Sequence, residues 1–139
     1  MSADVPAYVL DSYALLAYLQ NEPSAAQVGA IISQAAKTQA RILLCIVNFG
    51  EAVYIIERES GLTDAQRAIA AVDQLPIAVV EAGRELTFAA AHVKAHLALS
   101  YADAFAIALA QREQAMVLTG DPEFEKARGL IRVKWLPRN

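Results

Sequence analysis

Cysteine is nearly absent from this 139-residue sequence, whose only thiol is Cys45. A single cysteine excludes an internal disulfide, and a chain without disulfides is typical of a reducing cytoplasm. Cys45 lies within the apolar run 42–46, which indicates a buried, unreactive thiol rather than a nucleophile. We therefore expect a cytoplasmic protein whose chemistry does not use cysteine.

Several other signals are missing. No basic segment leads into an apolar run at the N-terminus, and the uncharged runs are too short for a membrane helix, so we expect neither a secretory signal nor a membrane partner. No glycine-rich phosphate loop and no Ser/His/Asp arrangement is present. His92 and His96 share a predicted helix face without a third ligand nearby, so we interpret them as partly exposed helix residues rather than a zinc pair.

Charge is scarce as well, since 19% of the residues are charged and 56% are hydrophobic. This composition excludes disorder and indicates helices on both faces of a buried sheet, and the length suits one domain over residues 1–139. The net charge of −3 argues mildly against a nucleic-acid partner. A basic C-terminal edge softens that objection, because it fits an RNA-facing surface about as well as a solvated one. This edge comprises Lys126, Arg128, Arg132, Lys134 and Arg138.

The hydrophobic pattern predicts strands that alternate with helices or helix pairs. Such alternation is typical of the α/β class, with a mostly parallel sheet and helices on both faces. The predicted strands are 5–10, 42–46, 77–80, 115–118 and 131–135, the last of them at a sheet edge. The predicted helices are 12–19, 23–37, 47–60, 63–74, 83–97 and 100–113, with a short helix after Asp121.

Local signals predict helix ends and core positions. Gly61 is predicted to end the helix 47–60 in a left-handed conformation, with Leu62 folding back on the last turn. A capping box at 63–66 predicts the start of the following helix, and Ser100 is the predicted cap of a later one. Most aromatic side chains are expected in the core, with some available to line a partner groove. They are Tyr13, Tyr18, Phe49, Tyr54, Phe88 and Phe105.

Four acidic residues stand alone in apolar surroundings. Asp11, Glu51 and Asp103 are each the only formal charge in a long apolar stretch, and Asp121 has no charged close neighbour on its N-terminal side. A carboxylate in such a place needs a donor or a cation beside it, because losing its hydration is costly. Each acid alone also has a structural interpretation, since Asp11 and Asp121 fit helix caps and Asp103 fits a helix dipole. This interpretation is weakest for Glu51.

The predicted fold brings these acids to one place. In an open parallel sheet, ligands bind at the carboxyl ends of the strands. Asp11 ends the first predicted strand and Asp121 follows the fourth, while Glu51 and Asp103 lie in the first turns of predicted helices. All four acids can therefore reach the same edge of the sheet.

A shared acidic pocket predicts a metal. Neighbouring carboxylates repel and take up protons unless a divalent cation neutralises them. Carboxylate oxygens without histidine or thiolate suit Mg²⁺ or Mn²⁺, and the hydroxyls of Ser12 and Thr119 are placed to support the acids by hydrogen bonds. Phosphodiester hydrolysis is the chemistry that uses such a site.

Four segments resemble the acidic motifs of PIN-domain ribonucleases, most closely those of VapC-type toxins from type II toxin–antitoxin pairs. They are 9–12, 48–52, 99–104 and 118–124, in the family's order and spacing. The resemblance implies a three-layer α/β/α sandwich, Mg²⁺- or Mn²⁺-dependent endoribonuclease activity on RNA, a homodimer, and inhibition by a cognate antitoxin. The metal-binding catalytic acids that it implies are Asp11, Glu51, Asp103 and Asp121, with Ser12 and Thr119 as supporting polar residues.

Gly120 departs from the family pattern, because many relatives carry a larger, often basic residue at this position. The departure removes one RNA contact and leaves the acids intact.

Two other functions fit parts of the sequence. A phosphatase with an aspartyl nucleophile would use Asp11 at the end of the first strand, but it needs a second acid where Tyr13 stands. A non-catalytic binding module of PIN-like fold would keep the four acids as caps or vestiges. The second alternative predicts no stabilisation by Mn²⁺.

Overall fold

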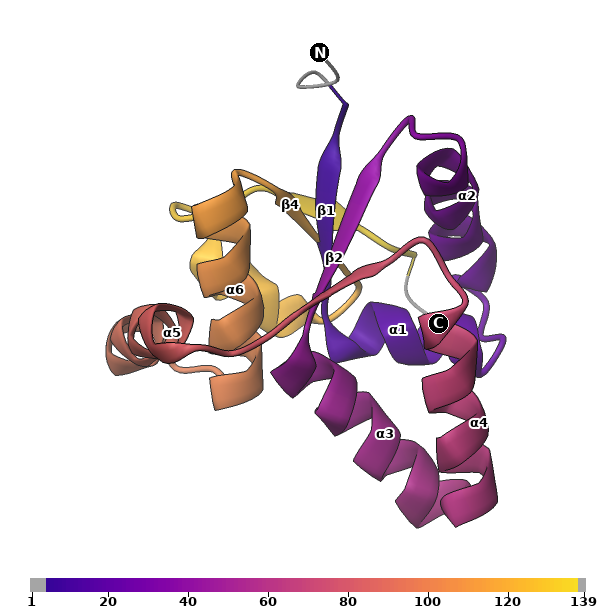
Figure 1. Cartoon of the computed structure of the whole chain (residues 1–139). Helices are drawn as coiled ribbons and strands as arrows, with labels where there is room; N and C mark the ends of the chain where they lie inside the picture. Colours follow the sequence, from indigo (N-terminus) through magenta and orange to yellow (C-terminus); the bar gives the residue numbers. More distant parts are fainter. Residues whose placement is uncertain (1–4, 138–139) are drawn as a thin grey trace.

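The computed structural model describes residues 5–137, which form one sheet and its covering helices (Figure 1). The strands are β1 (Ala7–Leu10), β2 (Arg41–Cys45), β3 (Ala78–Val80), β4 (Met116–Thr119) and β5 (Val133–Trp135). The helices are α1 (Ser12–Leu19), α2 (Ala25–Ala36), α3 (Ile46–Ser60), α4 (Leu62–Asp73), α5 (Arg84–His96), α6 (Tyr101–Glu113) and the 3-10 helix η1 (Pro122–Ala127). The hydrophobic pattern predicted these elements, with ends that differ by one or two residues.

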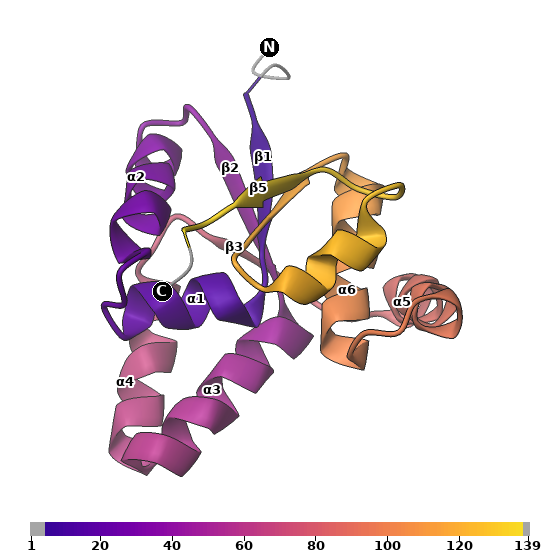
Figure 2. The ribbon, with the colours of Figure 1, turned by 180° about the vertical axis from the view of Figure 1, so that it is seen from behind.

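The sheet is parallel throughout, with the strand order β3-β2-β1-β4-β5 (Figures 1 and 2). β1 lies at the centre, and Leu10 pairs with Leu44 of β2 on one side and with Leu118 of β4 on the other. β5 is an edge strand, as predicted. The carboxyl ends of β1, β2 and β4 therefore meet at one edge of the sheet.

Side chains of β1 alternate between two hydrophobic clusters. Val9 packs with residues of α5, α6 and η1, whereas Tyr8 and Leu10 pack with residues of α1 and α2. Figure 1 shows these two groups of helices on opposite sides of the sheet. The predicted three-layer α/β/α sandwich is confirmed. Cys45 is buried in the first cluster as predicted, and burial raises the pKa of its thiol.

Helix α6 is buried along most of its length, from Asp103 to Ala110, because it lies between the sheet and α5. Within residues 5–137, no single helix is long and apolar enough to cross a membrane. Helices α5 and α6 taken together reach the required length and composition, but they are bent by 117° at the break between them.

The turn between α3 and α4 differs from the prediction. Gly61 ends α3 as expected, with a φ of 94° and an N–H that donates to the carbonyl of Glu57 at 2.8 Å. The same glycine also precedes the first residue of α4, so the predicted capping box at 63–66 does not form. Leu62 is 57% exposed and begins α4 instead of folding back on α3. One residue with a positive φ serves both helix ends, which leaves no place for a separate N-cap.

Two of the six aromatic residues, most of which were predicted to lie in the core, are exposed. Tyr54 is 51% exposed and Phe88 is 57% exposed, and the guanidinium groups of Arg58 and Arg84 lie over their rings at 5.2 and 4.9 Å. The arginines cover the rings in place of core packing. The aromatic residues that are buried or half-buried, as predicted, are Tyr13, Tyr18, Phe49 and Phe105.

Candidate active site

A hydrogen bond between Asp11 and Thr119 connects the carboxyl ends of the neighbouring strands β1 and β4. Asp11 follows β1 and is 1% exposed, and its Oδ1 accepts a hydrogen bond from the N–H of Ala14 at 2.8 Å, which caps α1. Its Oδ2 accepts from the hydroxyl of Thr119, the last residue of β4. The same hydroxyl accepts from the N–H of Asp121 at 3.0 Å. One threonine therefore holds two of the predicted acids in a fixed relation.

Glu51 is held by the other predicted hydroxyl. It lies on α3, which follows β2, and it is half-buried. The Oγ of Ser12 donates to Glu51 Oε1 at 2.6 Å, across a separation of 39 residues in the sequence. This bond joins the first turn of α1 to α3 and sets Glu51 beside the end of β1. Ser12, predicted to support the acids, thus contacts one of them directly.

Asp103 enters the site from the buried helix α6. It is 8% exposed and lies in the first turn, where its N–H donates to Ser100 Oγ at 3.0 Å. The predicted cap by Ser100 is confirmed. Asp121 also caps a helix, because its Oδ1 accepts from the N–H of Glu123 at 2.9 Å at the start of η1. Capping engages one carboxylate oxygen of Asp121 and leaves the other for a ligand.

The acids act on one another electrostatically. The pKa of Asp11 is raised from 3.8 to about 7, chiefly by burial and in addition by the charges of Asp103 and Asp121, whereas its hydrogen bonds with Thr119 and Ala14 act to lower it. The pKa of Asp103 is raised to about 6 by burial first, and then by the negative charges of Asp121, Glu51 and Glu123. The structure therefore brings all four predicted acids to one region where negative charge is unfavourable.

The donor set suits a hard cation. As the side chains stand, no three acidic, histidine or cysteine groups within residues 5–137 lie close enough together to hold a metal ion. Carboxylate oxygens are nevertheless the ligands that Mg²⁺ and Mn²⁺ prefer, and a cation would offset the repulsion between the acids, which contributes to the raised pKa values of Asp11 and Asp103. The residues present fit such an ion by their chemistry.

Asn48 is a polar residue of this region whose role the sequence did not predict. It is fully buried on α3, one turn before Glu51, and its Nδ2 donates to the carbonyl of Ala102 at 3.0 Å. Ala102 precedes Asp103, so Asn48 ties the helix of one acid to the helix of another. Its Oδ1 is buried without a hydrogen-bond partner. The usable signal was its position three residues before Glu51, which places both on one helix face.

Replacing Asn48 by alanine is expected to lower the free energy of unfolding by about 1 kcal/mol, because the partly buried carbonyl of Ala102 loses its donor. Urea unfolding of the variant and the parent measures this change. Thr87→Val is the control, since the hydroxyl of Thr87 donates to the carbonyl of Ala82 from a half-buried position and at 3.4 Å. An Asn48 variant as stable as the parent would contradict the tie between α3 and α6.

The other sequence candidates lie apart from the acids or are engaged locally. His92 and His96 are exposed on α5, as predicted, with ring centroids 4.6 Å apart. In the basic edge, Lys126 binds Glu123 and the carbonyl of Ala98, and Arg128 binds Glu125. These pairings support the interpretation of a solvated edge. Arg138 lies outside the described residues.

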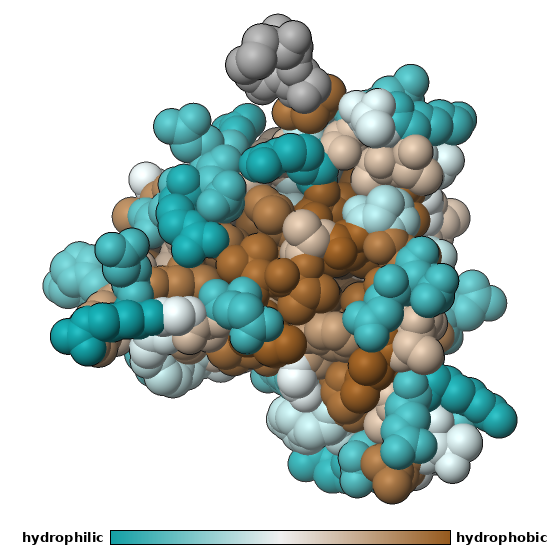
Figure 3. Space-filling model, in the orientation of Figure 1, coloured by the Kyte–Doolittle hydropathy of each residue, from teal (hydrophilic) through white to brown (hydrophobic). Residues whose placement is uncertain are grey.

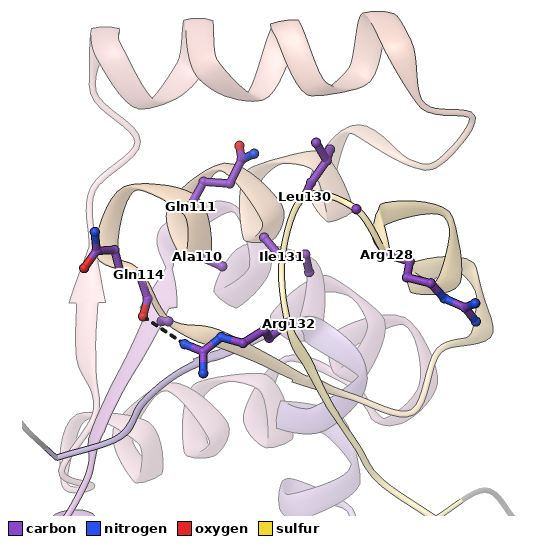
Figure 4. A pocket seen from close by; sticks show the side chains of 9 residues that line it. Ala110, Gln111, Gln114, Arg128, Leu130, Ile131 and Arg132 are labelled. Carbon is purple, nitrogen blue, oxygen red and sulfur yellow. Dashed lines mark hydrogen bonds between the residues drawn. The ribbon is translucent and has the colours of Figure 1, made fainter.

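A hollow of about 410 Å³ lies at the carboxyl end of α6 (Figure 4). Arg132 Nη2 donates there to the carbonyl of Gln114 at 3.4 Å, which places a cation at the negative end of the helix. At 1.5 Å per residue, Asp103 is roughly 15 Å away along α6. This hollow is therefore separate from the acidic site.

Comparisons with known proteins agree with the fold. Residues 8–130 match the sequence model of the PIN domain. No match is found among curated proteins. The solved structure of VapBC2 from Rickettsia felis, bound to a promoter DNA fragment, is similar with a TM-score of 0.75 and 14% identity, over 94% of this chain and 99% of that one.

Two further solved structures share the fold. VapC20 from Mycobacterium tuberculosis, described as a toxin that cleaves the sarcin–ricin loop, has a TM-score of 0.73 and 17% identity, over 91% of this chain and 98% of that one. DNA-bound VapBC from Salmonella typhimurium has a TM-score of 0.71 and 17% identity, over 94% and 98% of the two chains. The TM-scores show a shared fold.

Proposed function

This chain belongs to the PIN domain family, and from that premise we propose that it is a metal-dependent endoribonuclease, the toxin of a toxin–antitoxin pair acting in the cytoplasm. The observation that carries the proposal is the approach of four carboxylates to the carboxyl edge of a parallel sheet, where the charges of Asp103 and Asp121 raise the pKa of Asp11 and those of Asp121 and Glu51 raise the pKa of Asp103. The sarcin–ricin loop is the substrate given for VapC20, which supports RNA as the substrate class. The proposal treats the chain as one catalytic domain.

Each acid has a proposed role. Asp11, Asp103 and Asp121 hold one or two Mg²⁺ or Mn²⁺ ions, and Glu51 completes the set and orients the attacking water. A bound cation supplies an activated water, a polarised phosphate and a stabilised leaving oxygen. The protein prepares this chemistry through two hydroxyls, because Ser12 fixes Glu51 and Thr119 fixes Asp11 before substrate arrives.

A cognate antitoxin and a second copy of the chain are the proposed protein partners. Figure 3 shows a broad apolar area on the face seen in Figure 1, bordered by polar side chains. Large apolar patches of this kind are typical of protein interaction sites. A solved structure of similar fold is described as a toxin–antitoxin complex from Klebsiella pneumoniae, and this supports the same kind of partner here.

Incubation of the purified chain with total RNA tests the proposal. We expect discrete fragments with Mg²⁺ or Mn²⁺, and none with EDTA or with the Asp11→Asn variant. Fragments that persist in EDTA, or that the variant also produces, would contradict it.

Each alternative function predicts a different result. A phosphatase would release phosphate from a generic phosphomonoester. Its second acid is replaced by Tyr13, whose ring end packs against Gly120, so we expect no release. A binding module would cleave nothing and would gain no stability from Mn²⁺.

A further inference from the structure

Tyr13 and Gly120 form a contact that joins the two acid-bearing segments of the site. Gly120 lies between Thr119 and Asp121, and it is buried. A Cβ atom built on Gly120 would lie 2.5 Å from Tyr13 Cε1, 2.7 Å from Cζ and 2.8 Å from the hydroxyl oxygen. The hydroxyl end of the tyrosine therefore occupies the space that any side chain at position 120 would need.

Tyr13 is also close in sequence to Asp11, the acid that caps its helix. It follows Asp11 and Ser12 in the first turn of α1, and it is half-buried. The side chain thus starts two residues after Asp11, and its hydroxyl end reaches the backbone of Gly120, next to Asp121. Position 120 lacks a side chain of its own, and the tyrosine covers it.

We propose that the Tyr13 hydroxyl is a substrate contact, which donates a hydrogen bond to a phosphate oxygen of the RNA at the acidic site. The proposal rests on the ribonuclease function proposed above. It assigns to Tyr13 the RNA contact that the glycine at position 120 cannot make. A phosphodiester in this site thereby receives a donor from α1 instead of from the β4–η1 turn.

The charge of the site explains why a neutral donor is useful there. The carboxylates of Asp11, Asp103 and Asp121 only accept hydrogen bonds when ionised, and they repel a phosphate. Thr119 and Ser12 already donate their hydroxyl protons to Asp11 and Glu51. The phenol hydroxyl at Gly120 adds a donor next to Asp121 without adding a charge that would compete for the acids.

Helix α1 offers a matched control in Tyr18. This residue is also half-buried, and its Cε1 lies 3.6 Å from a Cβ built on a glycine, Gly29 of α2. That distance is ordinary contact, so alanine fits at Gly29 without moving the ring, whereas alanine at Gly120 must displace Tyr13. The two tyrosine–glycine pairs differ in tightness and in distance from the acids.

The first experiment compares Tyr13→Phe with Tyr18→Phe. Each variant loses one hydroxyl and keeps its aromatic ring. We expect Tyr13→Phe to lower kcat/KM for RNA roughly tenfold, mostly through KM, because a hydrogen bond to a charged group is lost. Its melting temperature should match that of the parent. Tyr18→Phe should leave both quantities unchanged. A Tyr13→Phe enzyme with parental KM would overturn the proposal.

The second experiment is a double-mutant cycle with Gly120→Ala. In the parent, we expect this change to lower kcat/KM at least as much as Tyr13→Phe, because the ring is forced out. In the Tyr13→Leu background it should have less than about a twofold further effect, since the atoms that meet the new Cβ are gone. Equal effects in both backgrounds would show that Gly120 acts without Tyr13. Gly29→Ala is the control.

Binding separates this proposal from the ribonuclease proposal. Anisotropy of a short fluorescein-labelled single-stranded RNA is measured with the cleavage-deficient Asp11→Asn chain and with the same chain carrying Tyr13→Phe. Roughly tenfold weaker binding by the double variant supports the contact even if the parent cuts no RNA. Equal binding overturns the contact even if the parent does cut, and no binding by either chain overturns it as well.

Discussion

Asp11→Asn is expected to reduce RNA cleavage on the order of a thousandfold or more and, at the same time, to stabilise the metal-free protein at neutral pH. Cleavage falls because the variant loses one anionic metal ligand at the centre of the site. Stability rises because the replaced carboxylate is 1% exposed and its pKa is raised to about 7. Loss of function with gain of stability distinguishes this residue from a purely structural acid.

The sign of the pH dependence follows from the raised pKa. An acid whose pKa is higher in the folded state than in the unfolded state binds its proton more tightly when folded. Asp11 therefore lowers stability progressively as the pH rises from about 4 to about 7, and no further above that. The difference between variant and parent should grow across this window. It should reach at most about 4 kcal/mol, less the loss of the bond from Thr119.

Urea unfolding in EDTA at pH 5 and pH 8 measures this difference, and RNA cleavage is assayed in parallel. Glu57→Gln is the control, because Glu57 lies exposed on α3 and its replacement should change stability by no more than about 0.5 kcal/mol. An Asp11 variant that is less stable than the parent at pH 8 would mean that capping of α1 outweighs the buried charge.

Much of the site was predictable because burial of a charge leaves a trace in sequence. Asp11, Glu51 and Asp103 each stand alone in apolar stretches, and parallel strands carry such residues to one edge. The strands were predictable from their burial as well. Short continuous apolar runs indicate strands that are buried on both faces.

What the sequence did not predict depends on contacts between distant segments. The fit of Tyr13 over Gly120 depends on the packing of α1 against the β4–η1 turn, and the bond from Asn48 to the carbonyl of Ala102 depends on how α3 meets α6. The capping box predicted for α4 does not form, because Gly61 both ends α3 and precedes α4. Local patterns describe how one segment folds, whereas these features need the relative positions of two.

Saturating Mn²⁺ is expected to raise the free energy of unfolding at pH 8 by about 3 kcal/mol, the value for a free ligand at a hundred times its dissociation constant. The gain should be smaller at pH 5. The pKa values of Asp11 and Asp103, about 7 and about 6, leave these groups protonated there, and protons compete with the metal. Thermal or urea unfolding with Mn²⁺ and with EDTA at both pH values measures the effect.

Two variants locate the ion. Asp103→Asn should lose most of the Mn²⁺ stabilisation, because it removes one ligand and lowers the negative charge that attracts the cation. A His92→Gln, His96→Gln chain should keep it, which excludes binding at the exposed histidine pair of α5. Stabilisation that is absent at pH 8, or that survives in Asp103→Asn, would return the four acids to structural roles, of which helix capping by Asp11 and Asp121 is one. In that case the charges of Asp11 and Asp103 would stand as an unrelieved cost to the fold, and the raised pKa values would have no functional explanation.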